Sequence, residues 1–183
     1  MDIKERLAKV RFFEVKPDFS PLNDNEKLAL ACCVDAGRIM TDIYLDQAYT
    51  DNKKIQKELL KRSDEEGKDL LRYFLIQGMP WDSYNHNEAF IAGVGPKPMF
   101  GSFYPPDFSK EEWGKWLEAH PEDANKFESG CTMIKRWDNG LFTVPYSVEY
   151  SEHLNKAAAF LRRAAMFLPA GALFSFLSAR AAA

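Results

Sequence analysis

The side chains best suited to metal chemistry are few and scattered in this sequence. Its three histidines are His86, His120 and His153, and none belongs to a His-Glu-x-x-His pair of the kind that zinc hydrolases use. Glu149 and His153 stand four residues apart, a spacing that puts both on one face of a predicted helix. Because a zinc site takes at least three protein ligands, we interpret this pair as part of an exposed polar face rather than as a metal site.

Two carboxylates raise the same question. Asp42 and Asp46 are also four residues apart, on the most apolar of the predicted helices. A carboxylate-bridged metal pair in a helix bundle needs Glu-x-x-His motifs as well, and none accompanies these residues. We therefore expect ion pairs with neighbouring cations here.

Nucleophilic and phosphate-binding motifs are absent as well. The chain has no Gly-x-Ser-x-Gly elbow, no Walker loop and no Gly-x-Gly-x-x-Gly after a strand. Its three cysteines, Cys32, Cys33 and Cys131, form neither a disulfide framework nor a zinc ribbon, so we expect thiols in a reducing cytoplasm. The sequence thus predicts no catalytic, cofactor-binding or metal-binding residue.

One segment stands out for its composition. Residues 93–108, GVGPKPMFGSFYPPDF, hold three glycines, four prolines and four aromatic side chains. Prolines on both sides of Lys97 remove amide donors that a phosphate cradle requires. The segment is then either an ordered connector pinned by its aromatic residues, which we favour, or a lip that contacts a peptide or protein through Phe100, Phe103 and Tyr104.

The elements that position these residues are mainly helical. The chain has 183 residues, 46% of them hydrophobic, and a formal net charge of −3, which predicts one domain over residues 1–183 and gives no reason to expect nucleic acid or an anionic membrane as a partner. The expected helices cover residues 2–9, 24–48, 52–62, 64–77, 110–119, 148–167 and 171–181, and the expected strands cover residues 131–136 and 141–145.

Local signals support several of these boundaries. Residues Asn23 with Glu26, Ser63 with Glu66, and Ser109 with Glu112 have capping-box spacing, and Ser147 can cap the helix that follows it. Asn139-Gly140 suits the turn of a small β-hairpin. The helix over 24–48 is apolar on several sides and is expected in the middle of the core. The fold class is therefore mainly α, with one small β-hairpin.

Three blocks of this sequence together resemble a known family. They begin at LNDNEKLALACC, at PWDSYNHNEAF and at GLFTVPYS, and in this order they resemble the N-terminal portion of the bacterial dipeptidyl-peptidase III family, from about residue 5 onward. The most specific part is GVGPKP with FYPPD, followed by TVPYS. The resemblance implies a zinc-dependent metallopeptidase. The family's zinc motifs, His-Glu-x-x-(x)-Gly-His and a later Glu-Glu, do not occur here. By the family pattern they would lie beyond residue 183, so no site residue is carried over. Some relatives carry a Nudix domain, whose sequence box is also absent.

These observations predict a structural portion of a dipeptidyl-peptidase-III-like enzyme, inactive alone and without a cofactor of its own, zinc being implied only for the full-length enzyme. We expect it to contact the remainder of the enzyme, or a second copy, through the apolar residues 167–183, which are too short to span a membrane. The alternative is a free-standing module that binds a peptide or protein through residues 93–108. A small enzyme that uses Glu149 and His153 is a weaker third hypothesis.

Overall fold

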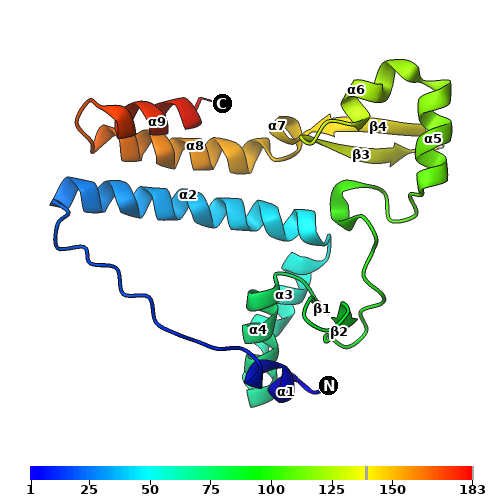
Figure 1. Ribbon diagram of the computed structural model, residues 1–183, viewed down its shortest axis with the longest axis horizontal. Helices are drawn as coiled ribbons and strands as arrows, with labels where there is room; N and C mark the ends of the chain where they lie inside the picture. Colours follow the sequence, from blue (N-terminus) through cyan, green and yellow to red (C-terminus); the bar gives the residue numbers. More distant parts are fainter. Residues whose placement is uncertain (139, 183) are drawn as a thin grey trace. The chain divides into compact units, whose positions relative to one another are not determined.

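The computed structural model describes residues 1–138 and 140–182 and is mainly helical, as predicted (Figure 1). The longer helices are α2 (Asp24–Ala48), α3 (Asn52–Lys61), α4 (Glu65–Gln77), α5 (Lys110–Ala119), α8 (Ser151–Met166) and α9 (Ala172–Arg180). Short helical turns are α1 (Ile3–Ala8), η1 (Gly101–Phe103), η2 (Pro121–Asp123), α6 (Ala124–Phe127) and α7 (Tyr146–Glu149). The strands are β1 (Trp81–Asp82), β2 (Glu88–Ala89), β3 (Thr132–Trp137) and β4 (Gly140–Pro145). No helix in the described part of the chain combines the length and apolarity needed to cross a bilayer.

Contacts group the chain into two compact units. Unit 1 comprises Met1–Phe12 and Leu45–Tyr146, and unit 2 comprises Phe13–Tyr44 and Ser147–Ala183. The prediction of one domain over the whole chain stays a prediction, and each unit is described by itself.

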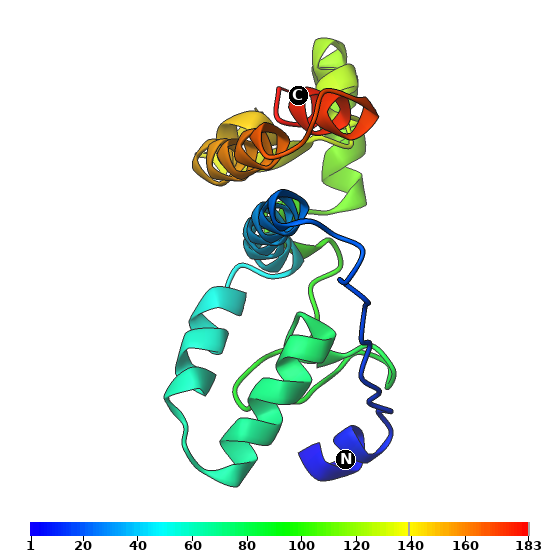
Figure 2. The same cartoon turned by 90° about the vertical axis from the view of Figure 1, so that its left-hand side faces the viewer.

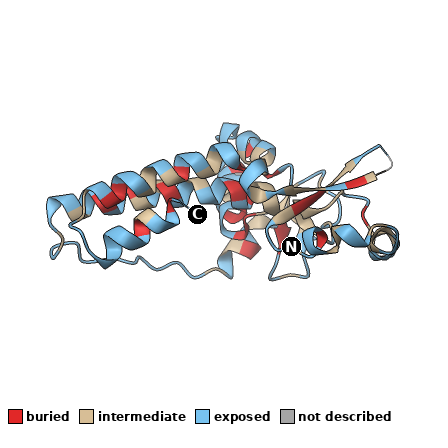
Figure 3. Ribbon diagram, turned by 90° about the horizontal axis from the view of Figure 1, so that it is seen from above, coloured by how far each residue is buried: buried red, intermediate tan, exposed pale blue. Residues whose placement is uncertain are grey.

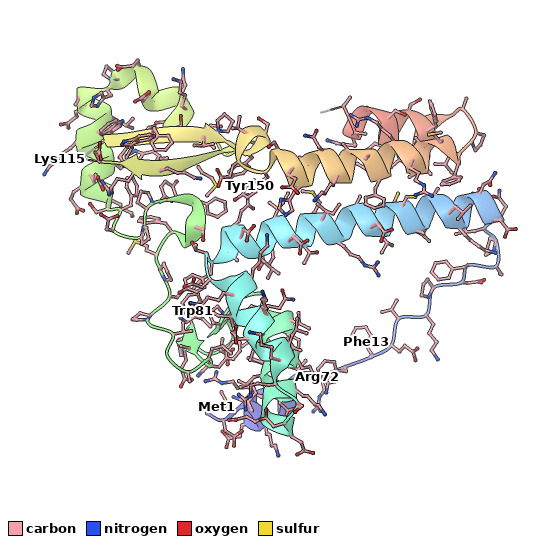
Figure 4. The ribbon with its side chains drawn as sticks, turned by 180° about the vertical axis from the view of Figure 1, so that it is seen from behind. Met1, Phe13, Arg72, Trp81, Lys115 and Tyr150 are labelled. Atoms are coloured by element: carbon pink, nitrogen blue, oxygen red, sulfur yellow. The ribbon has the colours of Figure 1, made fainter. Side chains whose placement is uncertain are left out.

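The first half of unit 1 packs around a buried tryptophan. Trp81 is 1% exposed, meets the ring of Tyr49 edge-on at 4.7 Å and donates from Nε1 to the Gly95 carbonyl at 2.8 Å (Figure 4). Nearby, the fully buried Asn52 donates from Nδ2 to the carbonyls of Leu45 and Gly78, both at 2.9 Å. The bond to Gly78 provides a donor for the carbonyl at the end of α4, and the Leu45 carbonyl near the end of α2 accepts from the Tyr49 amide as well.

The second half of unit 1 is the predicted hairpin with its cover of short helices. β3 and β4 pair antiparallel, with Ile134 opposite Thr143 and Arg136 opposite Leu141. Alternation along the strands sends Ile134 and Leu141 to one face, where they join Phe108 and Phe127 in a buried cluster. Trp113, Trp116 and Leu117 of α5 pack against the same cluster.

Unit 2 is built mainly from α2, α8 and α9, and its core consists mostly of small side chains. α9 folds back along α8 (Figures 1 and 2), and the buried residues of this unit's core cluster are Ala29, Cys32, Ala164, Ala165 and Leu177. The larger Phe160 and Phe167 are only partly buried against it. The buried positions therefore form narrow stripes on otherwise exposed helices (Figure 3).

Two expectations about helix ends were wrong. Asp64, not Ser63, accepts from the Gly67 amide and caps α4, and its carboxylate also accepts a hydrogen bond from Arg62. The helix expected over 148–167 is divided at Tyr150, whose backbone angles are φ −107° and ψ 20°, and Ser147 lies inside α7 instead of capping a helix. Capping by Asn23 with Glu26 is confirmed, since each side chain accepts from the other's backbone amide.

Three further points concern turns and burial. At Ser109, the hydroxyl accepts from the Glu112 amide, as expected. The proposed turn residue Asn139 lies outside the described residues. The expectation that α2 lies in the middle of the core was wrong, because residues on a second apolar face of that helix, Leu30, Val34 and Tyr44 among them, are exposed.

Candidate functional site

The aromatic residues of segment 93–108 have partners within unit 1. Tyr104 stacks on Phe108 at a centroid distance of 5.1 Å and lies 5.2 Å from the ring of Phe100. Trp113 of α5 approaches Tyr104 and Phe108, each at 6.0 Å, and Phe108 is 8% exposed. Phe100 and Tyr104 are thus half-buried parts of the hairpin's aromatic core.

The turn in the middle of this segment is also fixed. Gly101 has φ +59°, and a Cβ there would lie 3.1 Å from the Gln47 carbonyl oxygen, so both backbone geometry and space favour glycine. The next residue, Ser102, shares a hydrogen bond of 3.0 Å with Thr50. Phe103 lies 6.2 Å from the ring of Tyr146. The segment is therefore an ordered connector along the C-terminal end of α2.

A small cavity borders the start of the segment. It has a volume of about 350 Å³ and is lined on one side by Tyr49, Ile55 and Leu59 and on the other by residues 91–95. Phe100, Phe103 and Tyr104 are not among its lining residues. Contact of these three with a peptide stays a prediction, and the exposed apolar residue of the segment is Met99, 81% exposed.

A buried ion-pair cluster that sequence patterns did not reveal joins α1 to the β1–β2 ribbon. Asp82 and Glu88 are cross-strand partners, a position where two carboxylates would repel each other. Arg6, 2% exposed, donates from one guanidinium nitrogen to Asp82 and from the other to Glu88 at 2.7 Å. The hydrogen bond and charge of Arg6 hold the pKa of Glu88 below its usual range. The turn-forming residues SYNHN between the strands were the available signal for this ribbon.

A second ion pair links β3 to α5 beside the aromatic core. Arg136 of β3 binds Glu112 of α5 through two hydrogen bonds, of 2.6 and 3.0 Å, and lies 3.2 Å from Asp107 at the end of the segment. The bidentate bond from Arg136 lowers the pKa of Glu112. Both ion-pair clusters tie separate elements together. Arg6 and Asp82 also line a cavity of about 440 Å³, and Arg6 and Glu88 line another of about 520 Å³, but each of these carboxylates is bound by Arg6.

The structure keeps the potential metal ligands apart. His86 lies in the turn between β1 and β2, His120 stacks on Trp116 at 4.0 Å, and His153 lies on α8. The break at Tyr150 places Glu149 on α7, so the helix expected to carry it together with His153 is not continuous. Among residues 1–138 and 140–182, no three His, Cys, Asp or Glu side chains gather as a metal site would require. The residues described here therefore do not fit a zinc ion.

The remaining candidate groups are also accounted for by packing. Asp46 pairs with Lys53 at 2.5 Å, as expected for a carboxylate near cations. Cys32 is buried, Cys33 is partly buried and Cys131 is exposed, and all three are free thiols. Burial raises the pKa of Cys33, which opposes its use as a nucleophile.

Comparison with solved structures identifies what this arrangement is similar to. Dipeptidyl peptidase III from Caldithrix abyssi superposes on 98% of this chain with a TM-score of 0.93 and 40% sequence identity. The predicted resemblance to a part of dipeptidyl peptidase III is confirmed. Dipeptidyl-peptidase III from Corallococcus sp. strain EGB matches the same share with a TM-score of 0.90 and 36% identity. The chain spans only 34% of the length of each of these relatives.

A curated plant protein gives a weaker match. Nudix hydrolase 3 of Arabidopsis thaliana is 24% identical over an alignment of 234 positions that includes 100% of this chain and 30% of that protein. The Nudix sequence box does not occur in this chain. No protein-family model matches the chain.

Proposed function

We propose that this chain is a structural, non-catalytic part of a peptide hydrolase of the dipeptidyl peptidase III type. The observation that carries the proposal is the superposition of nearly the whole chain on one third of the Caldithrix abyssi enzyme, at a TM-score of 0.93 and 40% identity. Shape and sequence agree over the same residues, whereas the plant Nudix hydrolase is 24% identical to this chain.

The side chains of this chain support a structural rather than a catalytic role. In the described residues, no donor set fits a zinc ion. The buried Arg6 and Asp82 bind each other, and the partly buried Arg136 binds Glu112. Activation of a zinc-bound water requires three protein ligands and a general base, which the other two thirds of such an enzyme would supply. This chain would form a rigid wall beside that centre. The free thiols fit a reducing cytoplasm as its location.

A chimera tests the proposal. This chain would replace the matching third of the Caldithrix abyssi enzyme, and release of dipeptides from an oligopeptide would be compared with that of the parent enzyme. We expect a folded chimera that retains the parent's activity within about tenfold. A chimera that cannot be purified in folded form, or that is folded and inactive, contradicts the proposal.

The isolated chain provides the second half of the test. We expect it to retain far less than one equivalent of zinc after dialysis and to release no dipeptides. Stoichiometric zinc in elemental analysis, together with hydrolysis that a chelator abolishes, would show that the chain is an enzyme by itself.

A further inference from the structure

Helix α2 has two apolar stripes, and only one of them is used inside unit 2. The first stripe contains Ala29, Cys32, Ala36 and Ile43, all at most 7% exposed, and its first two residues pack in the core cluster with α8 and α9. The second consists of Leu30, Val34, Gly37, Thr41 and Tyr44. Its larger members Leu30, Val34 and Tyr44 are 39%, 47% and 48% exposed.

Helical geometry separates the two stripes clearly. The positions of the second stripe repeat at intervals of three and four residues over four turns, which places them on one line along the helix. With about 100° of rotation per residue, the centre of this line lies about 130° around α2 from the centre of Ala29 and Cys32. The charged residues of the same stretch, Asp35, Arg38 and Asp42, occupy the sector that remains. The second stripe is thus apolar or uncharged throughout.

Gly37 is an independent sign that another element approaches this stripe. Glycine inside a helix costs about 1 kcal/mol relative to alanine. Apart from its sequence neighbours and the backbone of its own helical turns, no heavy atom of the described residues lies within 4 Å of the position that a Cβ would take at Gly37, so packing against another element does not explain this glycine. A glycine at the centre of an uncharged stripe lets a second helix come close to the backbone of the first.

The extended segment before α2 adds further exposed apolar surface. α8 and α9 lie on one side of α2, and the segment leaves the start of α2 on the other (Figures 1 and 2). Along it, Phe13, Val15 and Phe19 alternate with charged residues and are 84%, 75% and 47% exposed. Exposure of two apolar surfaces to water is unfavourable, so they are expected to be covered by another element.

The relatives indicate what covers this surface. The fold of this chain recurs with a TM-score of 0.93 inside a chain of which it covers only 34%. The other two thirds of that chain therefore leave this fold unchanged, and any part of them that contacts it lies on its outer surface. Other exposed apolar side chains are less suitable, because the guanidinium of Arg180 lies 5.4 Å from the Phe176 ring and the exposed Trp137 sits beside Arg136 and Lys135.

We infer that the second stripe of α2, centred on Gly37, is the docking surface for an apolar helix from the two thirds of a dipeptidyl-peptidase-III-type enzyme that this chain does not cover. This inference rests on the proposed function. The partner helix is expected to carry small or aliphatic residues opposite Gly37 and no charge along the contact, since a buried unpaired charge is strongly unfavourable.

A substitution at Gly37 gives the sharpest test, because its effect should change sign. In the isolated chain, Gly37→Leu should raise the melting temperature, since leucine is the better helix former and its Cβ has no packing neighbour within 4 Å. In the chimera, the same substitution should lower the melting temperature and reduce dipeptide release at least tenfold, because the leucine side chain would occupy the space of the docked helix.

Charge placed on the stripe gives a second test with a matched control. In the chimera, the double variant Val34→Glu and Tyr44→Glu should reduce the yield of folded, active enzyme at least ten times more than Arg38→Glu, which only exchanges one charge for another in the charged sector. All these variants should keep the helix content of the isolated chain, because the stripe has no partner there.

The outcomes separate the inference from the proposed function. If the unmodified chimera fails to fold or is inactive, the proposed function is wrong and this inference with it. If it is active and the stripe variants behave like Arg38→Glu, the inference alone is wrong. If the isolated chain is a dimer that the stripe variants dissociate, while the chimera tolerates them, the occupant is a second copy and the inference is overturned.

Discussion

The two units of this protein solve the same packing problem with different side chains. Unit 1 buries large rings, among them Trp81, Phe74 and Tyr73, each at most 2% exposed, and ties its elements together with buried or half-buried ion pairs. Unit 2 buries mainly alanine and cysteine, together with Leu177, where its helices meet, and leaves the larger Leu30, Val34 and Tyr44 of α2 exposed.

This difference has consequences for stability. Burial of apolar surface contributes about 25 cal/mol per Å², so a core of rings stabilises its unit more than a core of methyl groups. Small side chains instead bring helix backbones close together, which leaves no room for additional atoms. Unit 1 should therefore be sensitive to the removal of side-chain volume, and unit 2 to its addition.

The largest effect is expected for truncation of the most buried ring. Trp81→Ala removes a side chain that is 1% exposed, together with its hydrogen bond to Gly95. It should lower the free energy of unfolding by about 4 kcal/mol, measured by urea denaturation. Trp137→Ala, at a position 73% exposed, serves as the control and should change it by less than about 0.5 kcal/mol. Equal effects of the two variants would show that unit 1 does not depend on its buried rings.

The aromatic connector should come next. Tyr104 packs against Phe100, Phe108 and Trp113 but is only half-buried, so Tyr104→Ala should cost about 3 kcal/mol, the low end for aromatic truncation. Met99→Ala in the same segment, 81% exposed, should have almost no effect. An unchanged melting temperature for Tyr104→Ala would favour the alternative in which this residue serves a peptide ligand.

Unit 2 should respond to added volume. Ala164 on α8 is 0% exposed, so Ala164→Leu forces α8 away from its neighbours and should cost about 2 kcal/mol. Ala159→Leu, on the exposed side of the same helix, should be neutral or slightly stabilising. Stabilisation by Ala164→Leu in thermal unfolding would contradict the description of a tightly packed core of small residues.

The smallest effect concerns a surface ion pair at the start of α4. The hydrogen bonds from Arg62 lower the pKa of Asp64 to about 2. An acid whose pKa is lower in the folded state stabilises the fold above its unfolded pKa of about 4, and this stabilisation is lost as the pH falls toward 2. Arg62→Ala should return the pKa of Asp64 toward 3.8 in an NMR titration and flatten the acid dependence of stability. Lys61→Ala, next in sequence, should leave that titration unchanged.

Hydrophobic periodicity and capping residues determined most of the secondary structure from the sequence. The boundaries of α2, α3, α5 and the β3–β4 hairpin agree with the predicted ranges to within about two residues, because each begins or ends at a local signal such as the Asn23 cap. The ordered blocks from GVGPKP to TVPYS were enough to indicate the resemblance that the solved structures confirm.

Only the tertiary structure decided which apolar and charged residues meet. The bonds from Arg6 to Asp82 and Glu88 join residues more than 70 positions apart, and no local pattern encodes that distance. The two apolar stripes of α2 have the same periodicity in the sequence, yet one is buried and the other is exposed. Periodicity shows which residues share a face of a helix. Whether that face is buried depends on whether another element packs against it, and this packing is decided only by the tertiary structure.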